Sequence, residues 1–264
     1  MPPPTVELVN PHLRRRPFRA AVFDFDGTVS LIREGWAKVM AGMGAELLGD
    51  PTQHDRLELE MLKLSGKPSI FQMRRLADEA ATAGKPSPHP DELLAEFVRR
   101  LAAITDDRRR RLAEGVDRPA AWAVPGTHDL LTNLRDRGVL LVLASGTPME
   151  AVREEAELLQ LTPFFGERMY APDGHSPNFS KRDVIDELVL DFGEQVIGFG
   201  DGYAETVEMK QVGGVAVGVA SREAGEVGVN PMKRQMLIDL GADVIVPDYA
   251  TPAALADWLF GNGR

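Results

Sequence analysis

A short apolar run near the N-terminus ends in two aspartates, and this feature constrains the fold more than any other. The run Ala21-Val22-Phe23 leads into Asp24-Phe25-Asp26-Gly27-Thr28. Aspartates spaced i and i+2 on an extended backbone point the same way, so both carboxylates can face one small site. An Asp-Gly pair also occurs in ordinary turns, which is the alternative interpretation of these residues. We interpret the segment as a buried strand that delivers two carboxylates to a reactive site.

Composition and charge exclude several classes of protein. Of the 264 residues, 44% are hydrophobic, so the chain can form a full core and is not expected to be disordered. A formal net charge of -10 argues against nucleic acid or an anionic membrane surface as a partner, because both need basic patches. No apolar run approaches the roughly 20 residues that span a bilayer. The absence of cysteine excludes disulfides, thiolate nucleophiles and cysteine metal sites.

The N-terminal segment lacks the features of a secretory signal. Residues 1–17 contain several prolines and a basic cluster, Arg14 to Arg16, but no apolar stretch. We interpret residues 1–17 as an extended arm, and we expect a cytoplasmic location.

Short β-type runs alternate with helical periodicity through most of the chain, which predicts an α/β fold. The β-type runs are Ala20 to Asp24, Val139 to Ala144, Val196 to Phe199, Val215 to Val219 and Val244 to Val246. The helices expected between them are Thr127 to Arg137, Met149 to Leu159, Lys181 to Asp191, Met232 to Leu240 and Ala253 to Phe260. This alternation predicts a parallel sheet with helices on both faces, and ligands of such sheets bind beyond the carboxyl ends of the strands.

The alternation is interrupted by a block of helical sequence. Between Leu31 and Trp122 no strand is expected, and amphipathic helices follow one another: Glu34 to Leu48, Gln53 to Leu64, Ser69 to Ala83, Asp91 to Ile104 and Arg108 to Glu114. We therefore divide the chain into an arm (1–17), an α/β core (18–30 and 122–264) and an inserted helical subdomain (31–121).

Two further positions at predicted strand or helix ends suit an anion. Ser145, followed by Gly146 and Thr147, ends a strand where backbone N–H groups are accessible, although a plain loop start fits equally well. Lys181 follows Ser180, a plausible N-cap, and so lies in the first helical turn, where a cation opposes the helix dipole. A lysine in this position either points to solvent or holds an anion or carboxylates.

A second carboxylate pair follows another predicted strand. Asp201 and Glu205 come directly after the run that ends at Gly200. Their i, i+4 spacing places them on one helical face, and carboxylate oxygens are the ligands that Mg²⁺ prefers.

The order and spacing of these residues resemble the phosphatases of the haloacid dehalogenase superfamily over nearly the whole chain. Asp24-Phe25-Asp26-Gly27-Thr28 is similar to the first motif of that superfamily, Ser145 to the second, Lys181 to the third, and Asp201 with Glu205 to the fourth. Glu205 stands where many relatives carry aspartate. The helical insert resembles the α-helical cap of the phosphoglycolate phosphatase and β-phosphoglucomutase branch, and the resemblance implies a Rossmann-like core.

The resemblance also implies a role for each motif residue. Asp24 would attack phosphorus and form an aspartyl-phosphate, Asp26 would act as general acid and then general base, and Lys181 would neutralise and orient. The implied cofactor is Mg²⁺, held by Asp24, the Asp26 carbonyl, Asp201 and Glu205. The implied phosphoryl-binding residues are Thr28, which braces the loop, Ser145, Gly146 and Thr147.

Residues of the insert are expected to contact the leaving group of the substrate. We select Arg33 and Lys67 as substrate-binding candidates, with Glu34, Trp36 and Gln72 as further cap candidates. Packing is the alternative role for Trp36, and a solvated loop is the alternative for Lys67. The run Arg108 to Arg111 is most simply a solvated helix face.

The function that these residues predict is Mg²⁺-dependent hydrolysis of a small phosphorylated metabolite, with a sugar or polyol phosphate as the expected monoester. The alternative is a phosphosugar mutase on the same scaffold, in which the phosphoryl group passes to a sugar hydroxyl instead of water. A phosphonate hydrolase and a non-catalytic binding protein are weaker alternatives. The sequence specifies neither the substrate nor the oligomeric state.

Overall fold

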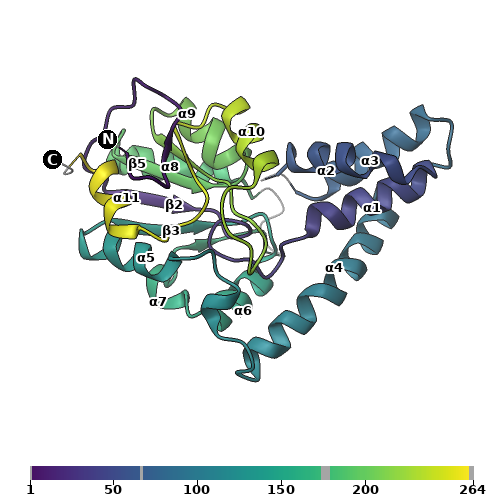
Figure 1. The fold of residues 1–264 in the computed structure, drawn as a ribbon, viewed down its shortest axis with the longest axis horizontal. Helices are drawn as coiled ribbons and strands as arrows, with labels where there is room; N and C mark the ends of the chain where they lie inside the picture. The colour runs from purple at the N-terminus through teal and green to yellow at the C-terminus, as the bar shows by residue number, and fades with distance from the viewer. Residues whose placement is uncertain (1, 66–67, 174–178, 262–264) are drawn as a thin grey trace.

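A seven-stranded sheet forms the centre of the molecule (Figure 1). The computed structural model describes residues 2–65, 68–173 and 179–261. The strands are β1 (Glu7–Leu8), β2 (Ala20–Phe23), β3 (Leu140–Ala144), β4 (Met169–Tyr170), β5 (Val196–Gly200), β6 (Val215–Val219) and β7 (Val244–Val246). Their order is β1-β7-β6-β5-β2-β3-β4, and every neighbouring pair is parallel except β1 with β7.

Helices cover both faces of the sheet because both faces are apolar. Along β2, Ala21 and Phe23 belong to one hydrophobic cluster while Ala20 and Val22 belong to another, as alternation along a strand requires. The first face packs against α5 (Thr127–Asp136), α6 (Met149–Leu158), α7 (Thr162–Phe165) and α11 (Pro252–Leu259). The second packs against α8 (Lys181–Phe192), α9 (Met209–Gln211) and α10 (Pro231–Asp239). The predicted α/β fold with a largely parallel, Rossmann-like sheet is confirmed.

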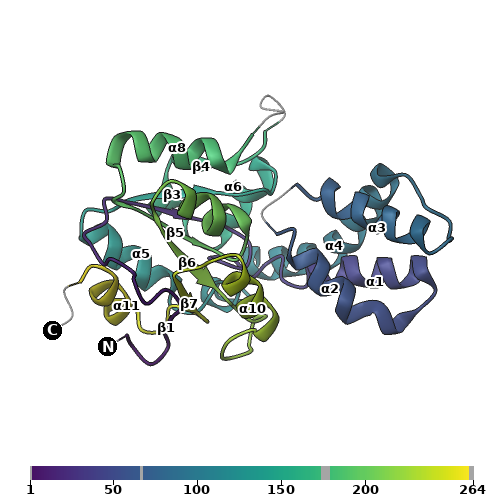
Figure 2. The ribbon, with the colours of Figure 1, turned by 90° about the horizontal axis from the view of Figure 1, so that it is seen from above.

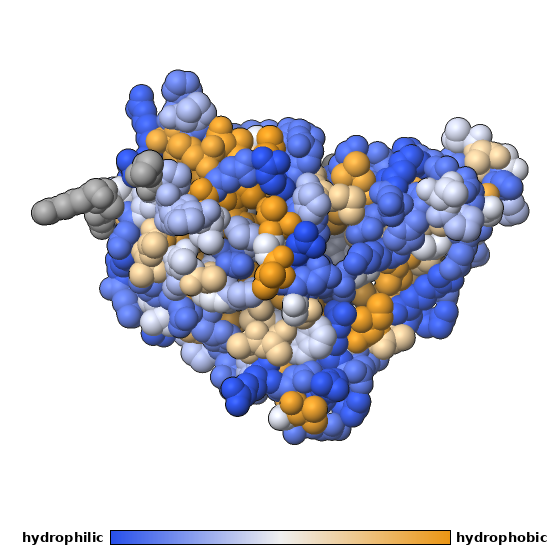
Figure 3. Space-filling view, in the orientation of Figure 1, coloured by the Kyte–Doolittle hydropathy of each residue, from blue (hydrophilic) through white to orange (hydrophobic). Residues whose placement is uncertain are grey.

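The remaining long helices form a group at one side of the sheet (Figures 1 and 2). They are α1 (Trp36–Leu48), α2 (His54–Leu62), α3 (Ile70–Thr82) and α4 (Pro90–Ala113), with short 3₁₀ turns at Pro51–Gln53 and Pro119–Ala121. Their apolar faces share one hydrophobic cluster with Met236 and Leu237 of α10, so the insert packs against the core at α10. Most of the insert's outer surface is hydrophilic in the view of Figure 3.

The two linkers that lead into and out of the insert pair with each other. Leu31 N donates to Trp122 O at 2.7 Å, and Val124 N donates to Val29 O at 3.2 Å. The chain therefore leaves the sheet after β2 and returns before α5 at one place, which attaches the insert beside the Asp24 strand end.

Arg108 fastens this attachment, which corrects the prediction of a solvated arginine face at this position. Its Nη1 donates to the carbonyl oxygens of Ile32 and Glu34, each at 2.8 Å, and the guanidinium lies 4.7 Å from the Trp122 ring centroid. Arg108 thus binds both linkers, because the carbonyl oxygens of Leu31, Ile32 and Glu34 and the ring face of Trp122 supply partners for a planar cation. Its neighbours Arg110 and Arg111 do form ion pairs at the surface.

Three local predictions were wrong or incomplete. The segments Asp91 to Ile104 and Arg108 to Glu114 form one helix, α4, because Thr105-Asp106-Asp107 are weak helix formers but not breakers, and Thr105 is buried. β4 and β1 were not expected, since two-residue strands show no measurable periodicity. Through β1 the N-terminal arm pairs with β7 and extends the sheet.

None of the helices in the described ranges is long and apolar enough to cross a membrane.

Candidate active site

Three predicted site segments meet at the carboxyl edge of the sheet because the strands that they follow are neighbours. β2 lies between β5 and β3, so Asp24 and Asp26 lie between Asp201, which follows β5, and Ser145, which follows β3. Asp24, Ser145, Asp201 and Glu205 are all buried. A buried charge requires a partner, so the contacts among these groups decide their chemistry.

Lys181 joins two of the carboxylates. Its Nζ lies 2.7 Å from Asp24 Oδ1 and 2.9 Å from Glu205 Oε1. Ser180 caps α8 by accepting a hydrogen bond from Arg182 N, as predicted, and this fixes Lys181 at the start of the helix. Burial lowers the pKa of Lys181, but the charges of Asp24 and Glu205 raise it by more than burial lowers it. The side chain therefore remains an ammonium ion.

The Asp24 carboxylate is held through one of its two oxygens. Oδ1 accepts hydrogen bonds from Lys181 Nζ and, at 2.7 Å, from Phe25 N. Burial raises the pKa of Asp24 to about 7, and Glu205 and Asp201 act in the same direction, while Lys181 opposes them. Three carboxylates therefore lie close enough to repel one another.

Glu205 follows β5 on a π-helical turn, Ala204–Glu208. A Cβ at Gly200 would lie 2.5–2.8 Å from the Glu205 side chain, so the glycine allows this carboxylate to lie against the end of β5. Burial raises the pKa of Glu205, and its Oε2 is buried without a hydrogen-bond partner in the described part of the chain.

Asp26 has different neighbours from Asp24. Its Oδ2 accepts a hydrogen bond from Thr147 Oγ1 at 2.7 Å, and its Oδ1 lies 3.8 Å from Arg33 Nε. Burial raises the pKa of Asp26 to about 6, against the lowering influence of Arg33 and Thr147. An acid with this pKa can both donate and accept a proton near neutral pH.

The other predicted phosphoryl-binding residues divide into two groups. Gly146 and Thr147 line the cavity next to Asp24 and Asp26. Ser145 lies behind them, where its Oγ accepts a hydrogen bond from Thr147 N at 3.1 Å. Thr28 is fully buried and does not line the cavity, and its Oγ1 has no partner among the described residues.

Arg33 belongs to a buried cluster that the sequence did not reveal. Its guanidinium donates to both oxygens of Glu155, at 2.7 and 3.2 Å, and Arg109 Nε lies 3.2 Å from the same carboxylate. Burial raises the pKa of Glu155 to about 7, with Arg33 and Arg109 opposing. Arg33 is thus oriented beside Asp26 by α6, and Arg109 is a second departure from the predicted solvated face.

A cavity of about 330 Å³ lies between the sheet edge and the insert. Asp24, Asp26 and Lys181 line its sheet end. The insert contributes a wall of apolar and polar side chains: Arg33, Trp36, Ser65, Ser69, Gln72, Phe97, Val98, Leu101, Ala102, Thr105 and Arg109. Trp36 and Gln72 therefore lie where the sequence predicted cap contacts. Lys67, the remaining substrate-binding candidate, is outside the described residues.

The insert also contacts the fourth motif directly. Ser65 Oγ donates to Asp201 Oδ1 at 3.3 Å, and Tyr203 N donates to Ser65 O at 3.2 Å. Ser65, which also lines the cavity, therefore joins the insert to the fourth motif.

Lys233 was not predicted as a site residue, and it is only 2% exposed. Its Nζ lies 2.7 Å from Glu34 Oε1 and 2.9 Å from Asp201 Oδ2. The signal that could have identified it is the one that identified Lys181: a lysine in the first turn of a helix, just after the capping residue Asn230.

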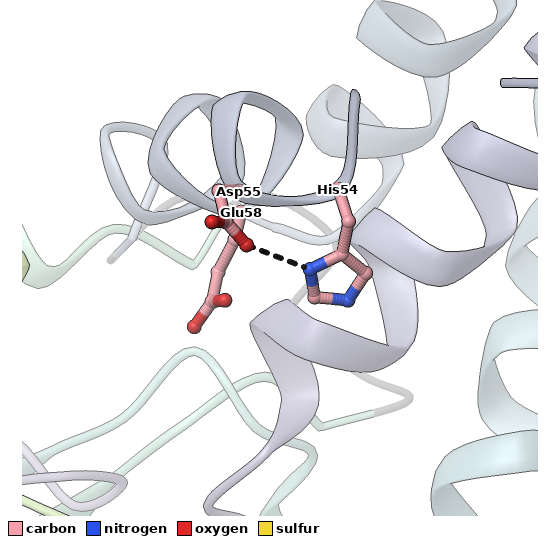
Figure 4. A group of neighbouring side chains, drawn as sticks. All are labelled: His54, Asp55 and Glu58. Atoms are coloured by element: carbon pink, nitrogen blue, oxygen red, sulfur yellow. Dashed lines mark hydrogen bonds and ion pairs between the residues drawn. The ribbon is translucent and has the colours of Figure 1, made fainter. Parts of the chain in front are cut away.

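Another group of possible metal ligands lies elsewhere. Within the described ranges, one group of three His, Asp or Glu side chains has all ligand atoms within 4.8 Å of one another: His54, Asp55 and Glu58 of α2 (Figure 4). The Asp55 side chain is 98% exposed and is 3.4 Å from His54 Nδ1. This group is on the insert, and none of the four predicted metal ligands belongs to it.

Comparisons with known proteins agree with the fold. A family model described as haloacid dehalogenase-like hydrolase matches residues 18–213. A haloacid dehalogenase-like protein of unknown function from Agrobacterium tumefaciens has a TM-score of 0.63 and 17% identity over 91% of this chain and 99% of its own. A haloacid dehalogenase family hydrolase from Deinococcus radiodurans, solved with bound phosphate and sodium, has a TM-score of 0.56 and 18% identity over 92% and 96%.

A third solved structure is described as a predicted phosphoglycolate phosphatase, from Haemophilus somnus. Its TM-score is 0.57, with 16% identity over 93% of this chain and 98% of its own. At these identities the three structures show a shared fold. A comparison with curated protein sequences gave no match.

Proposed function

The chain belongs to the haloacid dehalogenase-like hydrolases, and on this premise we propose that it is a Mg²⁺-dependent phosphatase acting through an aspartyl-phosphate. The observation that carries the proposal is the pair Asp24 and Asp26 at one end of the cavity. The ammonium group of Lys181 lies 2.7 Å from Asp24, and the pKa of Asp26 is raised to about 6. Residues 18–30 and 122–264 would form the catalytic core, and residues 31–121 the cap.

Asp24 is suited to act as the nucleophile. Its Oδ1 is occupied by Lys181 and Phe25 N, which leaves Oδ2 to attack phosphorus. A bond forms between Oδ2 and phosphorus while the bond from phosphorus to the leaving oxygen breaks. Lys181 fixes the carboxylate and offsets the negative charge that phosphate brings to the site.

Asp26 is suited to transfer the protons. With a pKa of about 6 it can give a proton to the departing alkoxide, and the resulting carboxylate can then take a proton from water. The water oxygen bonds to phosphorus, the bond to Asp24 Oδ2 breaks, and inorganic phosphate leaves. Thr147, through its hydrogen bond, sets the direction in which Asp26 points.

The chemistry of the proposed ligands suits a divalent cation. All donors are oxygens, as Mg²⁺ prefers, and they would be the Asp24 carboxylate, the Asp26 carbonyl, Asp201 and Glu205. Glu205 Oε2 is buried and lacks a hydrogen-bond partner in the described structure, and Asp24 is close enough to Asp201 and Glu205 for their charges to raise its pKa. Mg²⁺ would supply charge neutralisation for the phosphoryl oxygens.

The substrate is proposed to be a small phosphorylated metabolite. A cavity of about 330 Å³ between the sheet edge and the insert accommodates a small ligand and not a folded protein. Sugar or polyol phosphates remain the expected group, with Ser65, Ser69 and Gln72 as the hydroxyl-binding side chains of the described wall.

The test is release of inorganic phosphate from a panel of sugar, polyol, nucleotide and short-acid phosphates, with Mg²⁺ or with EDTA. The Asp24→Asn variant should lose at least about 10³-fold in kcat, because no nucleophile replaces the carboxylate. Asp136→Asn, a surface change on α5, is the matched control and should keep wild-type turnover.

Two results would contradict the proposal. Turnover that resists EDTA would show that the reaction needs no metal. Activity of the Asp24→Asn variant equal to that of the wild type would show that Asp24 is not the nucleophile. Isomerised product in place of free phosphate, when a trace of sugar bisphosphate is added, would identify a mutase.

A further inference from the structure

Lys233 is a buried cation that none of the proposed catalytic steps uses. It lies in the first turn of α10, where Asn230 Oδ1 accepts hydrogen bonds from Met232 N and Lys233 N. The ammonium contacts three acceptors: Glu34 Oε1 at 2.7 Å, Asp201 Oδ2 at 2.9 Å and Ser221 Oγ at 3.3 Å. Three acceptors match the three protons of an ammonium ion, so its hydrogen-bonding capacity is filled.

The position of Lys233 is energetically unfavourable unless carboxylates bind its ammonium group. A cation in the first turn opposes the helix dipole, and burial removes it from water. Two carboxylates from different parts of the chain offset both costs. One of them is Asp201, a proposed metal ligand, and the other is Glu34, which precedes the first helix of the insert.

A glycine of the first motif packs against the same pair. Gly27 has φ +72°, and a Cβ there would lie 2.2 Å from Asp201 Oδ2 and 2.8 Å from Lys233 Nζ. Its carbonyl oxygen accepts a hydrogen bond from Ser221 Oγ at 2.5 Å. The loop that carries Asp24 and Asp26 therefore closes directly over the contact between Lys233 and Asp201.

Glu34 is fixed to the insert as well as to Lys233. Its carbonyl oxygen accepts a hydrogen bond from Arg108 of α4, and its backbone N donates to Leu31 O at 3.2 Å. A change in the position of the insert relative to α10 must therefore act on the Glu34 side chain and through it on Lys233.

From this chain of contacts we infer that Lys233 is a positioning residue that couples the root of the insert, at Glu34, to the metal-binding carboxylate of Asp201. The inference rests on the proposed function, because Asp201 matters to the reaction only as a ligand. Glu34 and Asp201 share one ammonium ion, so a stronger hold on either carboxylate weakens the hold on the other.

The shared ion gives two substitutions opposite effects on metal affinity. In Glu34→Gln, Lys233 loses one of its two anions and neutralises Asp201 more fully, so the metal binds more weakly. In Lys233→Met, Asp201 regains its full charge and the metal binds more tightly. Turnover falls in both variants, because Asp201 or the insert is no longer held in place.

The experiment measures Mn²⁺ binding to the full chain by loss of the free-ion electron paramagnetic resonance signal, alongside kcat with Mg²⁺. We expect Kd for Mn²⁺ to rise about 5-fold or more in Glu34→Gln and to fall in Lys233→Met, in the range of ordinary site-to-site coupling. In the double variant Kd should equal that of Lys233→Met, because Glu34 acts only through the lysine.

Lys38→Met is the control, since it removes one lysine of the insert whose ion pair with Glu223 is at the surface, and Kd should stay within about 2-fold. If Lys233→Met does not fold, Glu34→Gln decides alone, because glutamine keeps the shape and can still accept a hydrogen bond from the lysine. An unchanged Kd in Glu34→Gln, or weaker binding in both single variants, would overturn the coupling while leaving the phosphatase proposal intact. Wild-type protein that binds no Mn²⁺ and shows no metal-dependent turnover would overturn both.

Discussion

Two buried lysines, Lys181 and Lys233, both lie at helix starts near the sheet edge and bind different sets of carboxylates. Each lies in the first turn of a helix, follows a side-chain N-cap, and bridges two acids at distances of 2.7 and 2.9 Å. Lys181 bridges Asp24 and Glu205, both from the core. Lys233 bridges Asp201 of the core and Glu34 of the insert's root.

The two lysine clusters differ in whether they reach the cavity. The Lys181 cluster lines the cavity through Asp24 and Lys181 itself, so it can touch a substrate. Lys233 and Glu34 are absent from the lining of that cavity, so we expect their effect on the reaction to pass through Asp201. In the proposed mechanism, Lys181 therefore acts at the reacting groups, and Lys233 connects Asp201 to the insert.

Replacement of Lys181 should have the largest effect of the two. Lys181→Met leaves Asp24 and Glu205 as uncompensated buried carboxylates and removes a cation from the substrate's phosphoryl group. We expect kcat to fall by about 10³-fold, the scale for one positioned charge in a catalytic site. Steady-state kinetics of Lys181→Met and Lys233→Met measured together provide the check. A larger loss in Lys233→Met would reverse the assignment of tasks.

Gly27→Ala should damage the Lys233 cluster selectively. The added methyl group would collide with Asp201 Oδ2 at 2.2 Å and would occupy a left-handed conformation, φ +72°. We expect kcat to fall about 10- to 100-fold and stability to fall by about 1–3 kcal/mol, as for a strained or overpacked position. Denaturant unfolding and kinetics measure the two effects.

Gly42→Ala, inside α1, is the matched control and should be neutral or slightly stabilising, because beyond the backbone of its own helix nothing lies within 4 Å of the new methyl group. Wild-type turnover in the Gly27→Ala variant would show that turnover does not depend on the packing of the loop at Gly27 against Lys233 and Asp201.

Asp26 lies at the same sheet edge, but neither Lys181 nor Lys233 contacts it. The Thr147→Val variant tests the pKa of Asp26. Burial raises that pKa to about 6, and Arg33 and Thr147 lower it. Loss of the Thr147 hydrogen bond removes a lowering influence, so the pKa rises and the acid stays protonated to a higher pH. The high-pH limb of kcat/KM should therefore move upward by less than about one pH unit, with a loss of a few-fold in rate. A limb that moves downward or stays would assign the proton transfer to another group.

Most elements of the core could be predicted because each has its own local signal. The apolar runs of β2, β3, β5, β6 and β7 match the strands within one residue at each end. α4 was divided in two because Thr105-Asp106-Asp107 are poor helix formers, and burial of Thr105 overrides that preference. β1 has no signal in two residues and exists because β7 offers it an edge.

The proposed catalytic positions could be predicted from the sequence for the same reason. Asp24, Asp26, Ser145, Lys181 and Asp201 each stand at the end of a strand or the start of a helix, and parallel strands bring such ends together whatever the details of packing. Pairing across the fold carries no such signal. Glu34 and Lys233 are 199 residues apart, Arg33 and Glu155 are 122 apart, and Arg108 reaches back to Ile32 and Glu34. The local sequence determines the charge of each side chain and whether it lies at a strand end or a helix start. Its partner depends on which helices pack together, and packing is a property of the whole chain.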